Sequence, residues 1–128
     1  MSETIVQIYV PATSNAPPAT GYYPCNLNGR YHARLVNITW ADKSLAADNR
    51  LITIQSNCFR MPYGAFAQTI LFNSRVDGEH RFQGQFCFDL EAAGNTLDLT
   101  ISSSKAYDNT ANNAFQFCIL SLAVTPAK

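Results

Sequence analysis

The segment at residues 81–90 constrains the fold of this chain more than any other. Its apolar or small residues alternate strictly with mostly polar ones, and they are Phe82, Gly84, Phe86, Phe88 and Leu90. Only a strand places successive side chains on opposite faces, so this period of two predicts a β-strand with one dry face and one wet face. Similar alternation recurs along most of the chain, and no segment has helical spacing. The sequence therefore predicts an all-β protein.

Turn signals separate the alternating segments at the regular spacing expected of a sandwich or barrel. Asp77-Gly78 and Gly94-Asn95 are hairpin-type turns. The predicted strands number about seven or eight, within the range of one sandwich domain. We expect an antiparallel β-sandwich, and a single jelly roll before an immunoglobulin-like sandwich, because the spacing of Cys25, Trp40 and Cys87 does not match an immunoglobulin core.

Two predicted strands change phase along their length. Within residues 31–40 the apolar positions are Tyr31, Ala33 and Leu35, and then Val36, Ile38 and Trp40. Within residues 115–124 the change falls between Ile119 and Leu120. Such a change indicates a β-bulge, or a strand that passes from one sheet into another.

The N-terminal residues 1–24 are predicted to form a strand and a Pro-rich arm, attached to a sandwich at residues 25–128. The strand carries the candidate interface residues Ile5, Val6, Ile8 and Val10, and residues 11–24 are expected to be an extended loop. Such a strand is suited to joining a neighbouring subunit's sheet edge. The alternative is that it folds back onto its own sheet.

Charge is sparse in this chain. Charged residues make up 14% of it and the formal net charge is zero, against about 25% charged residues in an average domain. Electrostatic repulsion between copies of the chain is therefore weak, which favours a homo-oligomer. A monomer with few charged surface residues would have the same composition. The basic residues form no stripe, so we expect no direct nucleic-acid binding. We also expect no membrane span and no signal peptide.

The four cysteines are evenly spread, without the C-x-x-C pair of a zinc site. They are Cys25, Cys58, Cys87 and Cys118. Cys87 lies at a wet-face position, and Cys118 shares a face with Gln116. These two are candidates for a cross-strand pair or a subunit contact. Free buried thiols are the other interpretation.

Neither histidine comes with a catalytic motif. His32 lies at a wet-face strand position and His80 lies beside a turn, and no G-x-S-x-G elbow is present. The loop with Asp108, Asn109, Asn112 and Asn113 is rich in oxygen atoms, but one carboxylate is few for calcium. We therefore expect no catalytic residue, no metal and no cofactor.

Four aromatic residues lie in or near predicted loops, namely Tyr22, Tyr23, Trp40 and Tyr63. Aromatic faces flanked by Asn and Gln suit a sugar-binding site, and they equally suit a protein interface. They are the candidate ligand-binding residues of a glycan receptor site.

Residues 28–40, followed by residues 49–54, resemble the opening of the small single jelly-roll capsid proteins of double-stranded DNA viruses. Residues 115–124 and their short tail resemble the closing strand of those proteins. The resemblance covers about the middle third of the chain and its last strand, as a pattern without a signature motif. It implies a structural virion component, such as a minor capsid, vertex or spike protein, with other virion proteins as partners. It carries over no site residue.

From these features we expect a non-enzymatic structural subunit located in a viral particle. The alternative is a lectin-like module that binds a carbohydrate or receptor. An enzyme is the third hypothesis, and it would need His32 or His80 to lie in a deep cleft beside a carboxylate.

Overall fold

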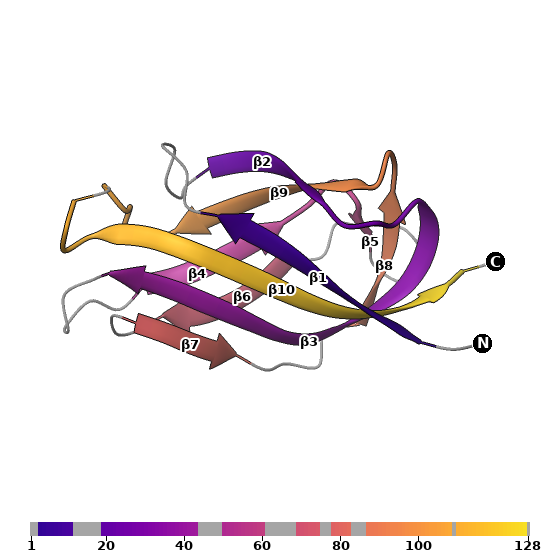
Figure 1. Cartoon of the computed structure of the whole chain (residues 1–128), viewed down its shortest axis with the longest axis horizontal. Coiled ribbons are helices and arrows are strands. Elements are labelled where there is room, and N and C mark those ends of the chain that lie inside the picture. The colour runs from indigo at the N-terminus through magenta and orange to yellow at the C-terminus, as the bar shows by residue number, and fades with distance from the viewer. Residues whose placement is uncertain are drawn as a thin grey trace.

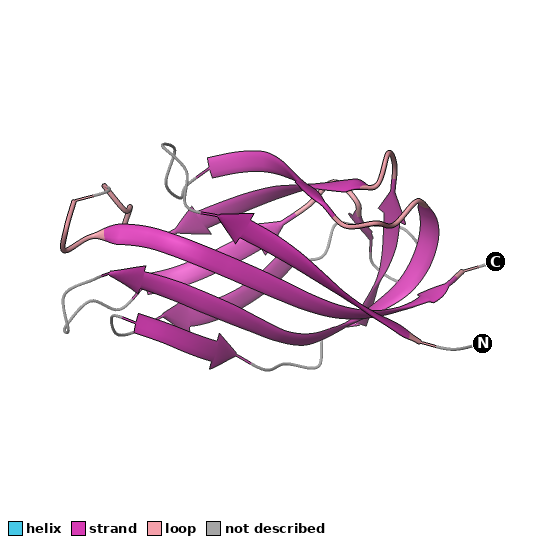
Figure 2. Ribbon diagram, viewed as in Figure 1, coloured by secondary structure: helices cyan, strands magenta, loops and turns pink. Residues whose placement is uncertain are grey.

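The computed structural model describes residues 3–11, 19–43, 50–60, 69–74, 78–82, 87–108 and 110–127. These residues form strands and loops, without a helix that could span a membrane (Figure 2). The all-β prediction is confirmed. The strands are β1 (Thr4–Pro11), β2 (Ala19–Pro24), β3 (Gly29–Lys43), β4 (Arg50–Gln55), β5 (Phe59–Arg60), β6 (Thr69–Ser74), β7 (Gly78–Phe82), β8 (Cys87–Ala92), β9 (Thr96–Ser103) and β10 (Ala114–Pro126).

The strands form two antiparallel sheets, as predicted for a sandwich (Figure 1). One sheet has six strands in the order β1-β10-β3-β8-β5, with β7 also paired to β3. The other has four strands in the order β2-β9-β4-β6. Both chain termini lie at the same end of the molecule (Figure 1).

The pairing of the strands is nested. The first strand pairs with the last over eight residue pairs, from Thr4 with Val124 to Pro11 with Phe117. Inside that pair, β2 pairs with β9, β3 with β8, and β4 with β6. The two chain halves therefore run alongside each other as one long antiparallel ribbon that supplies strands to both sheets.

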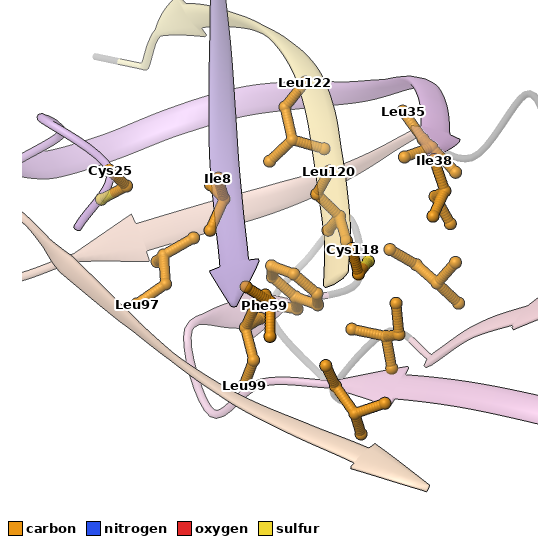
Figure 3. Close-up of a cluster of buried hydrophobic side chains, with 14 of the residues drawn as sticks. Ile8, Cys25, Leu35, Ile38, Phe59, Leu97, Leu99, Cys118, Leu120 and Leu122 are labelled. Atoms are coloured by element: carbon orange, nitrogen blue, oxygen red, sulfur yellow. The ribbon is translucent and has the colours of Figure 1, made fainter. Parts of the chain in front are cut away.

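The core lies between the sheets and follows the period of two. Ile52 and Ile54 of β4 and Leu97 and Leu99 of β9 are buried, while their neighbours along the strands are more exposed. From the six-stranded sheet, side chains such as Leu120 point toward them (Figure 3). Burial of these aliphatic side chains contributes about 1.5–3 kcal/mol each to folding.

The predicted bulge in residues 31–40 is confirmed. Leu122 pairs with Leu35 and Ser121 pairs with Asn37, so Val36 is the extra residue of β3. The bulge lets both Leu35 and Ile38 face the core although they are three residues apart.

The phase change in β10 occurs earlier than predicted. Phe115 pairs with Asp42 and Phe117 pairs with Ala41, so Gln116 is the extra residue. After this bulge, the residues from Cys118 onward alternate in the opposite phase. The prediction that Cys118 shares the wet face with Gln116 is therefore wrong, because Cys118 is fully buried among the core side chains (Figure 3).

Residues 81–90 were predicted as one strand, of which the structure describes the end of β7 and the first part of β8; residues 83–86 lie outside the described part of the chain. They pair with different halves of the long strand β3: β8 with its first half and β7 with its second. By contrast, the Gly94-Asn95 turn is confirmed, since both residues have positive φ, 67° and 61°, as a type I′ hairpin turn requires.

Both strands of the N-terminal segment belong to the sandwich of the single chain. β1 pairs with β10 as an edge strand of the six-stranded sheet, which is the fold-back alternative. The extended-loop prediction is wrong for β2, which is an edge strand of the other sheet. Gly21 and Pro24 disfavour a central strand, but an edge strand tolerates both residues. Residues 12–18 lie outside the described part of the chain.

Candidate functional site

A groove runs between the two edge strands β1 and β2. Its volume is about 650 Å³, and both strands supply its lining. Three large apolar side chains of the lining are exposed: Ile5 (55%), Tyr9 (54%) and Tyr22 (76%). Among the side chains whose exposure the structure describes, the other exposed large apolar one is Leu51 (42%). The described exposed apolar side chains are therefore concentrated at this groove, which we call the β1–β2 groove.

The alternation of β1 decides which predicted interface residues reach the surface. Ile8 and Val10 are buried in the core, and Val6 packs against it. Ile5 is exposed, and so is Tyr9, which the sequence reasoning missed. Tyr9 could have been found, because it is out of phase with Ile8 and Val10 on a strand that had been predicted.

The two tyrosines of β2 have different environments. Tyr22 projects into solvent, whereas Tyr23 packs against the core and burial raises the pKa of its hydroxyl, with a smaller contribution from the nearby Cys118. Tyr23 also lies over Gly21, where an added Cβ would be 2.6 Å from the Tyr23 hydroxyl. The groove therefore presents one tyrosine of β2 to solvent, not both.

The other predicted ligand-binding aromatics do not join this groove. Trp40 is fully buried in β3, so the prediction of a near-loop aromatic available to a ligand is wrong for it. Tyr63 lies outside the described residues. Of the candidate interface cysteines, Cys87 is exposed on β8 and Cys118 is in the core, and both are free thiols. Burial raises the pKa of the Cys118 thiol, which keeps it protonated and unreactive.

Trp40 belongs to a buried polar cluster with Asp42 and Tyr107. The Trp40 indole Nε1 donates to Asp42 Oδ2 at 3.3 Å and to the Tyr107 hydroxyl at 3.2 Å. The Tyr107 hydroxyl in turn donates to Asp42 Oδ2. Asp42 lies near the end of β3 and is fully buried. The cluster ties the loop after β9 to the end of β3.

Arg50 extends this cluster from β4. Its guanidinium carbon lies 4.0 Å from the centre of the Tyr107 ring, and its Nη2 donates to Asn113 Oδ1. Arg50 is 1% exposed, so substrate has no access to it in this conformation. The cluster therefore fixes the ends of four elements and is suited to stability rather than to catalysis.

Burial and the hydrogen bond to Asp42 raise the pKa of Tyr107. In the unfolded chain this hydroxyl ionises near its ordinary pKa of about 10. Its contribution to stability is therefore complete below pH 10 and is lost as the pH rises above that value. We expect Tyr107→Phe to be less stable than the wild type at pH 7, with the difference shrinking above pH 10, as measured by urea unfolding across this range. A constant difference would contradict the role of Tyr107.

A second polar cluster lies on the outer face of the six-stranded sheet. His32 Nδ1 is 2.9 Å from Asp89 Oδ1, and Arg34 donates to Glu3 at 3.1 Å. Cys87 stands opposite Arg34 in the register. The His32 side chain is 65% exposed, and the depression around these residues is open, so the deep cleft required for the enzyme hypothesis is not formed at His32. The side chain of His80 is not among those that the structure describes.

Among the described residues, no group of three His, Cys, Asp or Glu side chains is placed to hold a metal ion. In the oxygen-rich loop, Asp108 Oδ1 accepts hydrogen bonds from the backbone and the hydroxyl of Thr110, which lower the pKa of this carboxyl group. Asn113 binds Arg50 and the carbonyl of Ala106. The Asp108 carboxylate and the Asn113 amide therefore stabilise the conformation of this loop.

Two neighbouring rows on the outer face of the six-stranded sheet carry no charged side chain where they cross β1, β10 and β3. One row across β1, β10 and β3 contains Gln7, Ser121 and Asn37. The next row contains Tyr9, Ile119 and Thr39, with Arg81 of β7 at its end. Such a face can pack against a neighbour without burying unpaired charge.

The β1–β2 groove and these uncharged rows meet along β1 and form one continuous candidate surface. No protein-family model, no curated protein and no solved structure matches this chain.

Proposed function

We propose that this protein is a non-enzymatic structural subunit of a viral particle, a single jelly roll that assembles with copies of itself. The observation that carries the proposal is the nested strand order. In a jelly roll, an antiparallel ribbon of eight strands folds over so that alternate pairs fall into two sheets. The sheet orders β1-β10-β3-β8 and β2-β9-β4-β6 follow from such a ribbon.

Two departures from eight strands are small. β5 has two residues and pairs with β8, and β7 pairs with the second half of β3 beside β8. With β7 and β8, which both pair with β3, counted together, the remaining pairs match the ribbon. Jelly rolls serve in viral capsids and in lectins, so fold alone does not choose between these functions.

The surface favours the structural subunit. A capsid subunit must place large areas against neighbours, and this chain has zero net charge and two uncharged rows across β1, β10 and β3. It also has an apolar groove beside an edge strand. The sequence resemblance to single jelly-roll capsid proteins supports the same function.

The lectin-like alternative has one observation in its favour, the exposed Tyr22. Its ring stands in a groove beside polar side chains such as Gln7 and Asn26, a setting in which a sugar ring can stack on the aromatic face. Binding on a glycan array that disappears in Tyr22→Ala would support this alternative.

The test of the proposed function is assembly of the purified protein. We expect light scattering on a sizing column to show a closed oligomer whose mass is stable on dilution, and negative-stain images to show particles of one size. A monomer at every concentration, with or without other virion proteins, would contradict the proposal and favour the lectin-like alternative.

A further inference from the structure

The outer edges of the two sheets differ in how well they are protected. Natural sheets protect an edge by keeping it short, by placing charge or Pro on it, or by a bulge. In the six-stranded sheet, β5 is described over two residues, and β7, which pairs with β3, carries Glu79 and Arg81. In the four-stranded sheet, one edge strand is β2, which contains Gly21 and ends at Pro24, and the other is β6, which has six residues. The longest edge strand is β1, at the other edge of the six-stranded sheet.

β1 has none of these protections along its length. It is eight residues long and carries no charged residue, and its Pro is the last residue. Its register with β10 is continuous from Thr4 to Pro11, without a bulge that would twist the edge away. An edge strand of this kind is a template for another strand.

Exposed apolar side chains accompany this edge. Ile5 and Tyr9 point outward from β1, and Tyr22 stands across the β1–β2 groove. Backbone groups at the edge and apolar groups at the groove therefore lie on the same side of the molecule, where one partner strand would cover both.

We propose that the free edge of β1 pairs in an antiparallel manner with β1 of a second copy of this chain, about a two-fold axis. With Gln7 opposite Gln7 of the second copy, Ile5 lies opposite Tyr9, and Tyr9 opposite Ile5. The six-stranded sheets then continue into each other, and the two Tyr22 side chains approach from either side. This inference deepens the proposed function and rests on it.

Charge and symmetry favour a second copy as the occupant. In this register no two like charges face each other, because the nearest charged residue, Glu3, lies opposite Pro11 of the other copy and is already bound to Arg34. A two-fold pair also uses both free edges, so the association closes instead of growing into a fibre.

The first test places a lysine on the edge. We expect Tyr9→Lys to raise the dissociation constant of the two-fold pair at least tenfold, a loss of about 1.4 kcal/mol, so that light scattering during dilution shows the variant dissociating at concentrations at which the wild type stays assembled. Leu51→Lys is the matched control, because Leu51 is also an exposed strand residue but lies on the other sheet. Circular dichroism checks that both variants keep the fold.

A second test uses a disulfide to report the register. In a Cys87→Ser background, Gln7→Cys should form a covalent dimer on mild oxidation, while Leu51→Cys should remain a monomer on a non-reducing gel. If the wild type assembles but neither Tyr9→Lys nor Gln7→Cys behaves as expected, the β1 interface is overturned and the proposed function stands. If the wild type is monomeric throughout, both are overturned.

Discussion

Ile8→Asp is expected to destabilise the sandwich by about 4 kcal/mol or more, a large part of the roughly 5–15 kcal/mol that holds a typical domain together. Ile8 is fully buried between the sheets. The substitution removes its apolar burial, worth about 1.5–3 kcal/mol, and leaves a carboxylate in the core without a partner.

The matched control is Gln7→Asp, one residue away on the same strand but on its exposed face. It adds the same side chain and should cost about 1 kcal/mol or less. Urea unfolding followed by circular dichroism measures both. Equal, small effects would mean that the sandwich is stable without β1, and that the N-terminal segment is an arm after all.

Asp42→Ala is expected to cost about 3–5 kcal/mol, because the carboxyl group is the shared acceptor of a buried cluster. Without it, the Tyr107 hydroxyl and the Trp40 indole lose their hydrogen bonds to Oδ2. Asp42→Asn keeps an oxygen at this position and should restore part of the loss.

Asp89→Ala is the control for this change. It also removes a strand carboxylate with a close partner, but its partner His32 is exposed, so the cost should stay below about 1 kcal/mol. Thermal unfolding of Asp42→Ala, Asp42→Asn and Asp89→Ala ranks the three variants by stability. If Asp42→Ala were as stable as Asp89→Ala, the buried cluster would not hold the loop and the strand ends together.

The sequence was sufficient to predict features that depend on local patterns. The period of two predicted most of the strands, the phase change after Leu35 predicted a bulge or a passage between sheets, of which the structure has the bulge, and Gly94-Asn95 predicted the hairpin turn. Each of these signals lies within a few neighbouring residues, and no distant partner is needed to interpret them.

Features that depend on a distant partner were missed. The bulge at Gln116 exists because of how β10 aligns with β3, and misplacing it put Cys118 on the wrong face. The burial of Asp42 was not predicted, because charged side chains favour solvent. Its burial depends on Tyr107, 65 residues further along the chain.

The candidate site was predicted in pieces. Ile5 and Tyr22 were named separately, one for an interface and one for a ligand, and the fold brings them to the same groove. The sequence could not join them, because β1 and β2 belong to different sheets and meet only when the sandwich closes.

The pairing of the first strand with the last has a consequence for biosynthesis. Chains are made from the N-terminus and strands that must find distant partners fold slowly, so β1 is made well before β10, the strand with which it pairs. Until β10 has been made, neither the core face of β1 nor its free edge has its final shape. A nascent chain therefore cannot present the surface on which we propose that subunits meet before β10 has paired with β1.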